Sequence, residues 1–331
     1  MTEVQTCALP ISFKDAFAAL QNGDTLYIPA GYFLIDRKVD VKVDRDMTVL
    51  GADNAVLKFN EHDRIHFNAR KWTHVQLAQT VARGDTAIPV SRTDSIKVGD
   101  VFHLGNDEAA ETGWKYKKAD THRISAISGN TVRISTPLNF GYRSDTLDPA
   151  IKIYRSKRLT VDNMQIQSAF RGTKLGFRGL RHAEVRNITC RETSGEARYT
   201  WGLHFFSVGS CVDMQFEGLT FYGGSYNILV NSGRDLYFRD IEAHHSRHAV
   251  TPASWVDGIY VTGLRGYDCD GVMDAHPSFN VHYDSVRTVD RASSNRRSFG
   301  GCIRNSTFPS IGVGGNSGAY FQNIAVTDGV D

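Results

Sequence analysis

A short strand pattern recurs through the second half of the chain: an apolar residue, a variable residue, a turn-forming residue and, in most copies, a second apolar residue. The third position is always Asn, Gly, Asp or Ser. Consecutive copies begin 18 to 31 residues apart, and most steps are close to 22. The eight copies begin at Val161, Val185, Phe216, Phe238, Val261, Tyr283, Ile303 and Phe321. Such a period predicts a repeat architecture.

The length of the repeat favours a parallel β-helix over other repeat folds. About 22 residues are too few for a strand–helix–strand unit, but they suit one turn of a coil that supplies about three short strands. The leucine-rich repeat has a similar length, yet its Leu-x-x-Leu-x-Leu frame is absent. An antiparallel sandwich with coincidental spacing is the alternative. A single turn cannot bury its apolar residues, whereas stacked turns form a continuous core.

The N-terminal part predicts a short helix followed by strands. Residues 13–20 (FKDAFAAL) have helical spacing of their apolar positions, and Met47–Gly51 and Val56–Phe59 are typical of early strands. Residues Met1–Ile11 do not fit the pattern that follows them, and we leave them out of the fold prediction.

The middle of the chain interrupts the repeat. From about residue 74 to 154, alternating strands with tight turns predict a small inserted antiparallel β subdomain. We expect it to wall one side of a groove, and an independent binding role is the alternative. We therefore expect three parts: 12–73 as the cap and first turns, 74–154 as the insertion, and 155–331 as the main turns. Asp331 falls inside a repeat, so the coil is expected to continue beyond it.

One segment carries a resemblance to a known family. Ala18–Gly31 (AALQNGDTLYIPAG) resembles the start of pectate-lyase-like β-helices, which include phage tailspikes. The resemblance implies an all-β, right-handed parallel β-helix (a solenoid) whose open end is covered by a short N-terminal capping helix. It also implies a secreted or virion-associated protein that binds polysaccharide and forms a homotrimer. A shared fold specifies activity only weakly.

Composition removes several other functions. No run among the 331 residues is apolar and long enough to span a bilayer, and the net charge of +2 gives no reason to expect a nucleic-acid partner. The five cysteines are widely spaced and include no C-x-x-C pair, which argues against a disulfide scaffold or a zinc site. Cys190 falls on an inward position and is expected in the core. We expect no cofactor and no membrane partner.

Stacking would align residues that are distant in the sequence. The segments 201–205, 226–230, 247–251 and 272–276 are expected on adjacent turns about 5 Å apart. Their outward positions predict a polar stripe that includes an Arg-His-Ala stretch and, one turn later, an Asp-x-His stretch, both similar to motifs of tailspike-like β-helices. The predicted catalytic residues are Arg247, His248, Asp274 and His276, and the predicted substrate-binding residues are Trp201, His204, Tyr226, Asn227, Arg265 and Arg287. Structural roles are the alternative for each.

The excess of basic residues in the second half of the chain indicates the class of substrate. Residues 151–310 contain 17 Arg and 3 Lys against 15 Asp and Glu, and the guanidinium group pairs at two points with carboxylates. This excess favours an acidic, uronic-acid-containing glycan. Further arginines that could contribute are Arg171, Arg178, Arg198, Arg296 and Arg297.

The sequence leaves three mechanisms open. We prefer a polysaccharide lyase, in which His248 or His276 removes a proton, Arg247 neutralises the substrate carboxylate and Asp274 orients the base. A glycoside hydrolase would use Asp274 with Asp270 or Asp257. A metal ion held by His248, Asp274 and His276 is a further option, although no acidic cluster supports it. A non-catalytic adhesin that binds glycan in the same groove is the rival from a different class.

Overall fold

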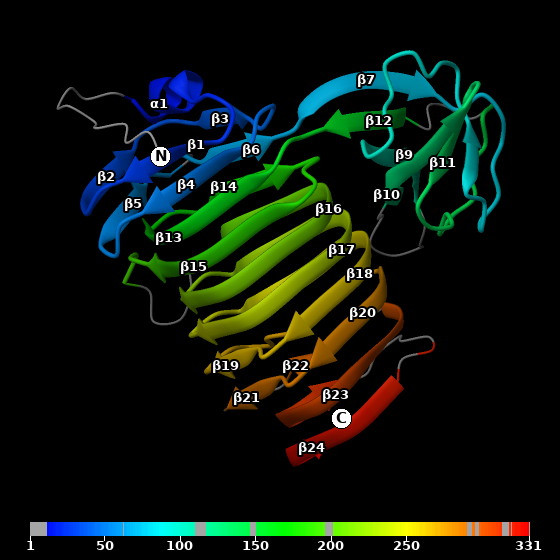
Figure 1. The fold of residues 1–331 in the computed structure, drawn as a ribbon. Helices are drawn as coiled ribbons and strands as arrows, with labels where there is room; N and C mark the ends of the chain where they lie inside the picture. Colours follow the sequence, from blue (N-terminus) through cyan, green and yellow to red (C-terminus); the bar gives the residue numbers. More distant parts are fainter. Residues whose placement is uncertain are drawn as a thin grey trace.

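The computed structural model describes residues 12–61, 63–109, 117–145, 150–195, 201–289, 293–294, 298–312, 318 and 320–330. Within these residues the chain forms one short helix, a parallel sheet of 18 strands wound into a coil, and a separate antiparallel sheet of six strands (Figure 1). The predicted all-β parallel β-helix with a capping helix and an antiparallel insertion is therefore confirmed. None of the helical residues described forms a segment long and apolar enough to cross a membrane.

The coil is built from strands that pair in parallel with those of the turns before and after. Its strands are β1 (Asp24–Ile28), β2 (Gly31–Ile35), β3 (Val39–Lys42), β4 (Met47–Gly51), β5 (Ala55–Phe59), β6 (Ile65–Asn68), β13 (Leu159–Ser168), β14 (Gly172–Arg178), β15 (Ala183–Glu192), β16 (Leu203–Tyr222), β17 (Tyr226–His244), β18 (His248–Thr262), β19 (Arg265–Tyr267), β20 (Ser278–Asp284), β21 (Arg287–Val289), β22 (Ser293–Ser294), β23 (Ser298–Gly312) and β24 (Tyr320–Val330).

Stacking of the turns produces three long surfaces, which we call faces A, B and C in chain order. Face A contains β3, β6, β14 and the first parts of β16, β17 and β18, where Tyr226 lies beside His248. Face B follows after a corner and contains β1, β4 and the middle parts of the long strands. Face C contains β2, β5, β19 and β21, where Arg265 lies beside Arg287.

The turn-forming third position of the repeat is the corner between faces B and C. In all eight copies this residue has a left-handed backbone, which Asn, Asp and Gly tolerate better than most residues. The eight φ angles lie between 50° and 71°, at Asn163, Asn187, Gly218, Asp240, Gly263, Ser285, Asn305 and Asn323. Side chains also bond between turns: Asn187 Nδ2 donates to Asp162 Oδ1 at 2.9 Å. The repeat therefore records a backbone requirement as well as a hydrophobic one.

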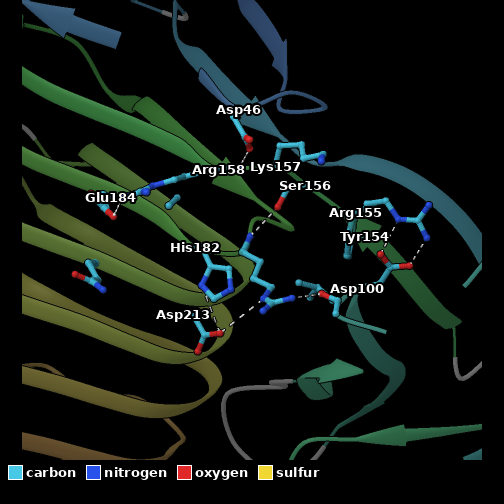
Figure 2. Close-up of a pocket in the computed structure, with 15 residues that line it drawn as sticks. Asp46, Asp100, Tyr154, Arg155, Ser156, Lys157, Arg158, His182, Glu184 and Asp213 are labelled. Carbon is cyan, nitrogen blue, oxygen red and sulfur yellow. Dashed lines mark hydrogen bonds and ion pairs between the residues drawn. The ribbon is translucent and has the colours of Figure 1, made fainter. Parts of the chain in front are cut away.

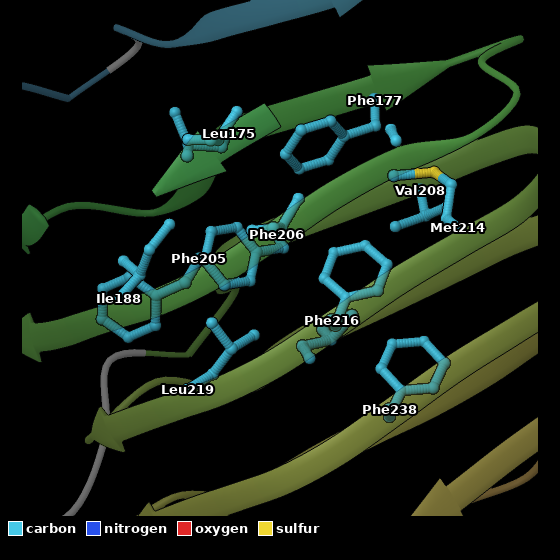
Figure 3. Packing of buried hydrophobic residues seen from close by; sticks show 14 of the residues in the cluster. Leu175, Phe177, Ile188, Phe205, Phe206, Val208, Met214, Phe216, Leu219 and Phe238 are labelled. Carbon is cyan, nitrogen blue, oxygen red and sulfur yellow. The ribbon is translucent and has the colours of Figure 1, made fainter. Parts of the chain in front are cut away.

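The interior of the coil is filled by apolar side chains that stack from turn to turn (Figure 3). Phe216 and Phe238 begin consecutive copies of the repeat, and their rings are stacked 4.9 Å apart. Such aromatic pairs contribute about 0.5–1.5 kcal/mol beyond their buried area. Cys190 is completely buried in this core, as predicted.

Helix α1 (Phe13–Ala19) covers the first turn of the coil. Ser12 caps it by accepting a hydrogen bond from the Asp15 amide at 3.2 Å. The Phe17 ring packs edge-on against Phe67, 5.8 Å away, at the start of the core. A helix here shields the apolar cross-section that an uncovered turn would expose.

The insertion leaves the coil after β6, between faces A and B. Its strands are β7 (Arg70–Gln76), β8 (Ala87–Pro89), β9 (Val101–Ala109), β10 (Lys117–Ser128), β11 (Thr131–Ile134) and β12 (Ala150–Arg155). They pair antiparallel in the order β7-β12-β9-β10-β11-β8 and bury an apolar core of their own. The coil resumes at β13, which pairs with β4, and β10 contacts β16, β17 and β18.

Candidate functional site

Three predicted catalytic side chains meet on face A. Asp274 Oδ2 lies 3.2 Å from His248 Nε2 and 3.3 Å from His276 Nε2. The bridge between Val250 and Met273 joins the two turns that carry these residues. The side chains of His248 and Asp274 are almost completely buried, whereas that of His276 is 19% exposed. His276 is therefore the imidazole of this cluster that is most accessible from outside.

The protonation of His248 follows from its contacts. Its Nδ1 lies 2.6 Å from the Gly271 carbonyl oxygen, which can only accept, so Nδ1 carries a hydrogen. Burial lowers the pKa of His248, although the nearby Asp274 acts in the opposite direction. In neutral His248 the lone pair is then on Nε2, which makes no aligned hydrogen bond despite its closeness to Asp274. One proton shared between His248 Nε2 and the Asp274 carboxylate would stabilise both groups. The pair is therefore suited to sharing a proton or passing it on.

A cluster of aromatic rings and one arginine lies beside His248. The rings of His204, Tyr226 and His248 follow one another at 5.4 Å and 5.2 Å. The Arg247 guanidinium lies 4.3 Å above the Trp201 ring and 4.9 Å from the Tyr226 ring, and it donates to the Tyr226 hydroxyl. Trp201 is 54% exposed. We call Trp201, His204, Tyr226 and Arg247 the aromatic–arginine cluster.

Burial keeps His204 uncharged. Its pKa is lowered to about 4 because the ring is largely buried. The positive charge of the aromatic–arginine cluster therefore resides on Arg247 at neutral pH, next to an exposed aromatic face. This combination suits a sugar ring that carries a carboxylate, because the guanidinium can pair with the acid while the ring stacks.

Three of the predicted substrate-binding residues lie elsewhere. Asn227 is completely buried, and its Nδ2 donates to Ser246 Oγ at 2.8 Å inside the corner between faces C and A. The outward position predicted for it was wrong, because alternation breaks at this corner. Arg265 and Arg287 are exposed but lie on neighbouring strands of face C, so they are not part of the cluster on face A.

The remaining candidates separate clearly. Asp257, one of the possible hydrolase carboxylates, is buried and bound by Arg234, by Asn139 Nδ2 at 2.8 Å and by Asn280 Nδ2 at 2.7 Å, which gives it a structural role. No group of three or more His, Cys, Asp or Glu side chains in the described ranges is arranged to hold a metal ion. Arg198, Arg296 and Arg297 lie outside the described residues.

A polar pocket of about 500 Å³ lies where the insertion joins the coil (Figure 2). Its charges are largely engaged within the pocket wall: Arg155 pairs with Asp100 at 2.6 Å and Arg158 with Glu184 at 2.5 Å. Arg181 Nη1 donates to the Gly99 carbonyl at 2.9 Å, which ties face B to the insertion. Because these charged side chains pair with groups of the pocket wall, we assign them the structural role of joining the insertion to the coil.

Sequence reasoning also missed a second pocket, which lies between the insertion and the later turns. It is lined by the aromatic residues Phe140, Trp255, Phe279 and Phe299. Phe279 and Phe299 occupy equivalent positions on adjacent strands, and this 20-residue step is the one signal that could have identified them. The contribution of Phe140 could not be anticipated, because it comes from the insertion.

Comparisons with known proteins identify the fold. No family model matches the chain, and no curated protein matches its sequence. The tailspike protein gp49 of Pseudomonas phage LKA1 matches with a TM-score of 0.53 at 14% identity, covering 94% of this chain and 71% of that one. The tailspike gp61 of Pseudomonas phage phi297 matches with a TM-score of 0.52 at 12% identity, covering 92% of this chain and 66% of that one.

These matches define the class of protein at the level of the fold. The chain is a parallel β-helix of the kind found in phage tailspikes, as the resemblance of Ala18–Gly31 implied. It spans roughly two thirds of the length of the tailspikes that it matches. Sequence identity of this size shows a common fold and nothing finer.

Proposed function

We propose that the protein is a polysaccharide depolymerase that binds an acidic, uronic-acid-containing glycan over face A and cleaves it by β-elimination. One observation carries the proposal: an exposed tryptophan and a stacked arginine lie on the same face as a His–Asp–His cluster of which only His276 is partly exposed. The fold shared with two phage tailspikes supports a virion-associated location. A polysaccharide partner and a homotrimeric assembly are part of the proposal through the resemblance of Ala18–Gly31 to tailspike-like β-helices.

In this mechanism each side chain has one role. Arg247 pairs with the substrate carboxylate and stabilises the negative charge that develops there when the adjacent carbon loses its proton. His276 takes that proton, because it is the more accessible imidazole. Asp274 stabilises the resulting imidazolium, and His248, 3.2 Å from the same carboxylate oxygen, can share a proton with it. The electron pair of the broken C–H bond forms a C=C bond, the glycosidic C–O bond breaks, and the departing oxygen takes a proton from water.

The test is incubation of the protein with polygalacturonate, alginate, hyaluronan and neutral dextran. Elimination produces an unsaturated uronate with strong ultraviolet absorbance, whereas hydrolysis produces reducing ends without it. New reducing ends alone would replace our proposal with a glycoside hydrolase. Binding of a glycan without any product would replace it with an adhesin.

The residue assignment has its own test. His276→Gln should lower turnover about 10²–10⁴-fold, the range for loss of a general base, while glycan binding persists. His282→Gln is the matched control, since this half-buried histidine lies on face B, where it stacks on Tyr260 at 5.0 Å. Equal turnover in the two variants would remove His276 from the mechanism.

A further inference from the structure

The aromatic pocket lies between the insertion and the corner that joins faces A and B, and it has a volume of about 760 Å³. The rings of Trp255, Phe279 and Phe299 pack together at 5.5–6.1 Å, and Phe140 from the insertion packs edge-on against Trp255 at 4.7 Å. Phe140, Phe279 and Phe299 remain partly exposed. Partly exposed aromatic surface around a cavity of this size is typical of a ligand site.

An extra residue in β18 places Trp255 in the aromatic pocket. In the two preceding turns the A–B corner contains one left-handed serine, Ser210 or Ser232, followed three residues later by a left-handed aspartate. In β18 the equivalent Ser254 is followed by Trp255, which is also left-handed with φ 63°, and the register shifts at this point. Two consecutive left-handed residues without glycine are costly, and such outliers concentrate at functional sites.

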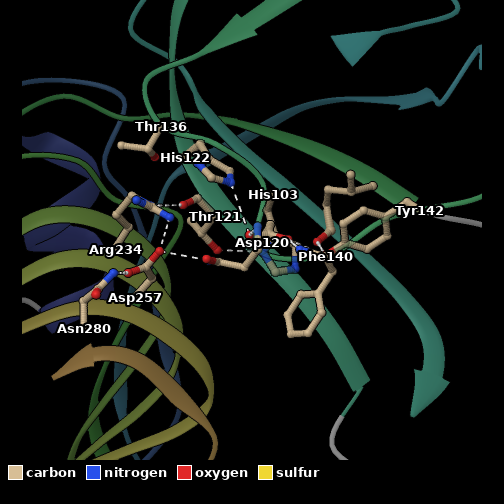
Figure 4. A network of polar contacts seen from close by, with 12 residues as sticks. His103, Asp120, Thr121, His122, Thr136, Phe140, Tyr142, Arg234, Asp257 and Asn280 are labelled. Atoms are coloured by element: carbon tan, nitrogen blue, oxygen red, sulfur yellow. Dashed lines mark hydrogen bonds and ion pairs between the residues drawn. The ribbon is translucent and has the colours of Figure 1, made fainter. Parts of the chain in front are cut away.

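The loop of the insertion that faces these rings is held in position. The Asp120 carboxylate accepts hydrogen bonds from the backbone amides of Asn139 and Phe140 at 3.0 and 3.3 Å and from the Tyr142 hydroxyl at 2.8 Å (Figure 4). Burial alone would raise the pKa of Asp120, but contacts led by the one with His122 lower it overall, so the carboxylate stays ionised. The pocket is thus organised before any ligand arrives.

Polar groups of the pocket are oriented by Asp257. The Nδ2 atoms of Asn139 and Asn280 both donate to this carboxylate, so the amide oxygens face other directions and can accept from sugar hydroxyls. Trp255 Nε1 is buried and has no hydrogen-bond partner within the described ranges, although a buried indole N–H usually has one. Arg83 and Lys118 also line the pocket and supply positive charge.

Backbone hydrogen bonds join the segment that carries His276 to the segment that carries Trp255. The His276 amide donates to the Pro252 carbonyl at 2.9 Å, and the Trp255 amide donates to the Pro277 carbonyl at 2.7 Å. Phe279 is three residues beyond His276, so their Cα atoms are at most about 10 Å apart. A glycan that crosses face A from Trp201 to His276 would reach the pocket with its next sugar units.

We propose that this pocket is a second glycan-binding subsite, which takes an anionic sugar unit of the same chain that is cut at His276. The inference rests on the proposed function. It adds where on the protein the glycan continues and which part of the protein recognises it. Aromatic side chains would stack on the sugar, the two amide oxygens would accept from its hydroxyls, and Arg83 and Lys118 would attract its carboxylate. The insertion is then a specificity element that the coil by itself lacks.

The experiment compares variants of the full chain by affinity electrophoresis in gels that contain alginate, polygalacturonate, hyaluronan or neutral dextran. The pocket variants are R83A/K118A and F299A. The matched control is K97A/R133A, which removes two exposed charges from the insertion outside the pocket. We expect the pocket variants to bind the acidic polysaccharide about tenfold more weakly, or about 1.4 kcal/mol, while the control binds like the wild type. Circular dichroism verifies that each variant is folded.

Kinetics separate this subsite from the catalytic residues. Pocket variants should raise KM and leave kcat at saturating polysaccharide within about twofold, because uniform binding is removed without touching the reacting atoms. If the wild-type protein binds an acidic polysaccharide and the pocket variants bind it as tightly as the control does, this inference is overturned and the proposed function stays intact. Wild-type protein that binds none of the acidic polysaccharides would overturn both.

Discussion

At the scale of single residues, environment decides what each titratable group can do. His248 and His276 contact the same Asp274 oxygen, yet they differ in exposure. His248 is buried and donates to a carbonyl, while His276 is partly exposed. Arg247 is comparable, because two aromatic rings and a hydroxyl hold its guanidinium in one orientation. A charge held in this way loses little freedom when it pairs with a substrate.

Replacement of Arg247 by Lys tests this geometry while preserving the charge. Lysine cannot stack as a plane or pair at two points with a carboxylate, so we expect KM for the acidic polysaccharide to rise about tenfold. Arg265→Lys on face C is the control and should leave KM unchanged. An R247K enzyme that is indistinguishable from wild type in steady-state assays would remove the guanidinium from substrate recognition.

At the scale of elements, the repeat describes a backbone requirement at the corner between faces B and C, which we call the corner rule. Its third position must be left-handed on every turn, and the side chain there can bond to the turn before it. Strands as short as β19 and β21 remain in register because the corners before them are in register. The bulge at Ser254–Trp255 departs from a similar rule at the A–B corner, and it is where the insertion approaches the coil.

Asn187 provides a test of the corner rule. Asn187→Val places a β-branched residue at φ 54° and removes the bond to Asp162, so the free energy of unfolding should fall by about 2–3 kcal/mol. Asn187→Gly keeps the backbone conformation and should cost about 1 kcal/mol. Thr189→Val on the same strand should change stability by less than about 0.5 kcal/mol. Urea unfolding measures all three, and equal losses for Val and Gly would contradict a conformational origin.

At the scale of the whole molecule, buried histidines link stability to pH. Burial lowers the pKa values of His66, His103 and His204 to about 4, from an ordinary value of 6.5. Between these values the unfolded chain binds protons that the folded chain does not, so these three histidines lower the free energy of unfolding as pH decreases from 6.5 towards 4. Above 6.5 these three groups are neutral in both states and contribute no slope.

Urea unfolding at a series of pH values from 7 to 4.5 checks this dependence. We expect the midpoint to move steadily to lower urea below pH 6.5, and His103→Gln to reduce the slope because one of the linked protons is removed. A midpoint that is constant across this range would show that the three histidines titrate normally in the folded protein.

The sequence alone determined the architecture. Each turn of the coil obeys the same local rules, so the period of Val161 to Phe321 and the Asn, Asp, Gly and Ser at the corners repeat them often enough to be read. The same stacking predicted that Arg247, His248, Asp274 and His276 would be close, and the contacts of Asp274 with both histidines agree with that prediction. Their catalytic role stays a proposal.

Only the tertiary structure decided which side chains face the same way and what lies beside them. Alternation of side chains holds within a straight strand, but left-handed corners change their direction, and for this reason Asn227 points inward. Arg265 and Arg287 follow another corner and therefore lie on face C. The aromatic pocket joins Phe140 to Phe279 and Phe299, and contacts between an insertion and a coil have no periodic signature in the sequence.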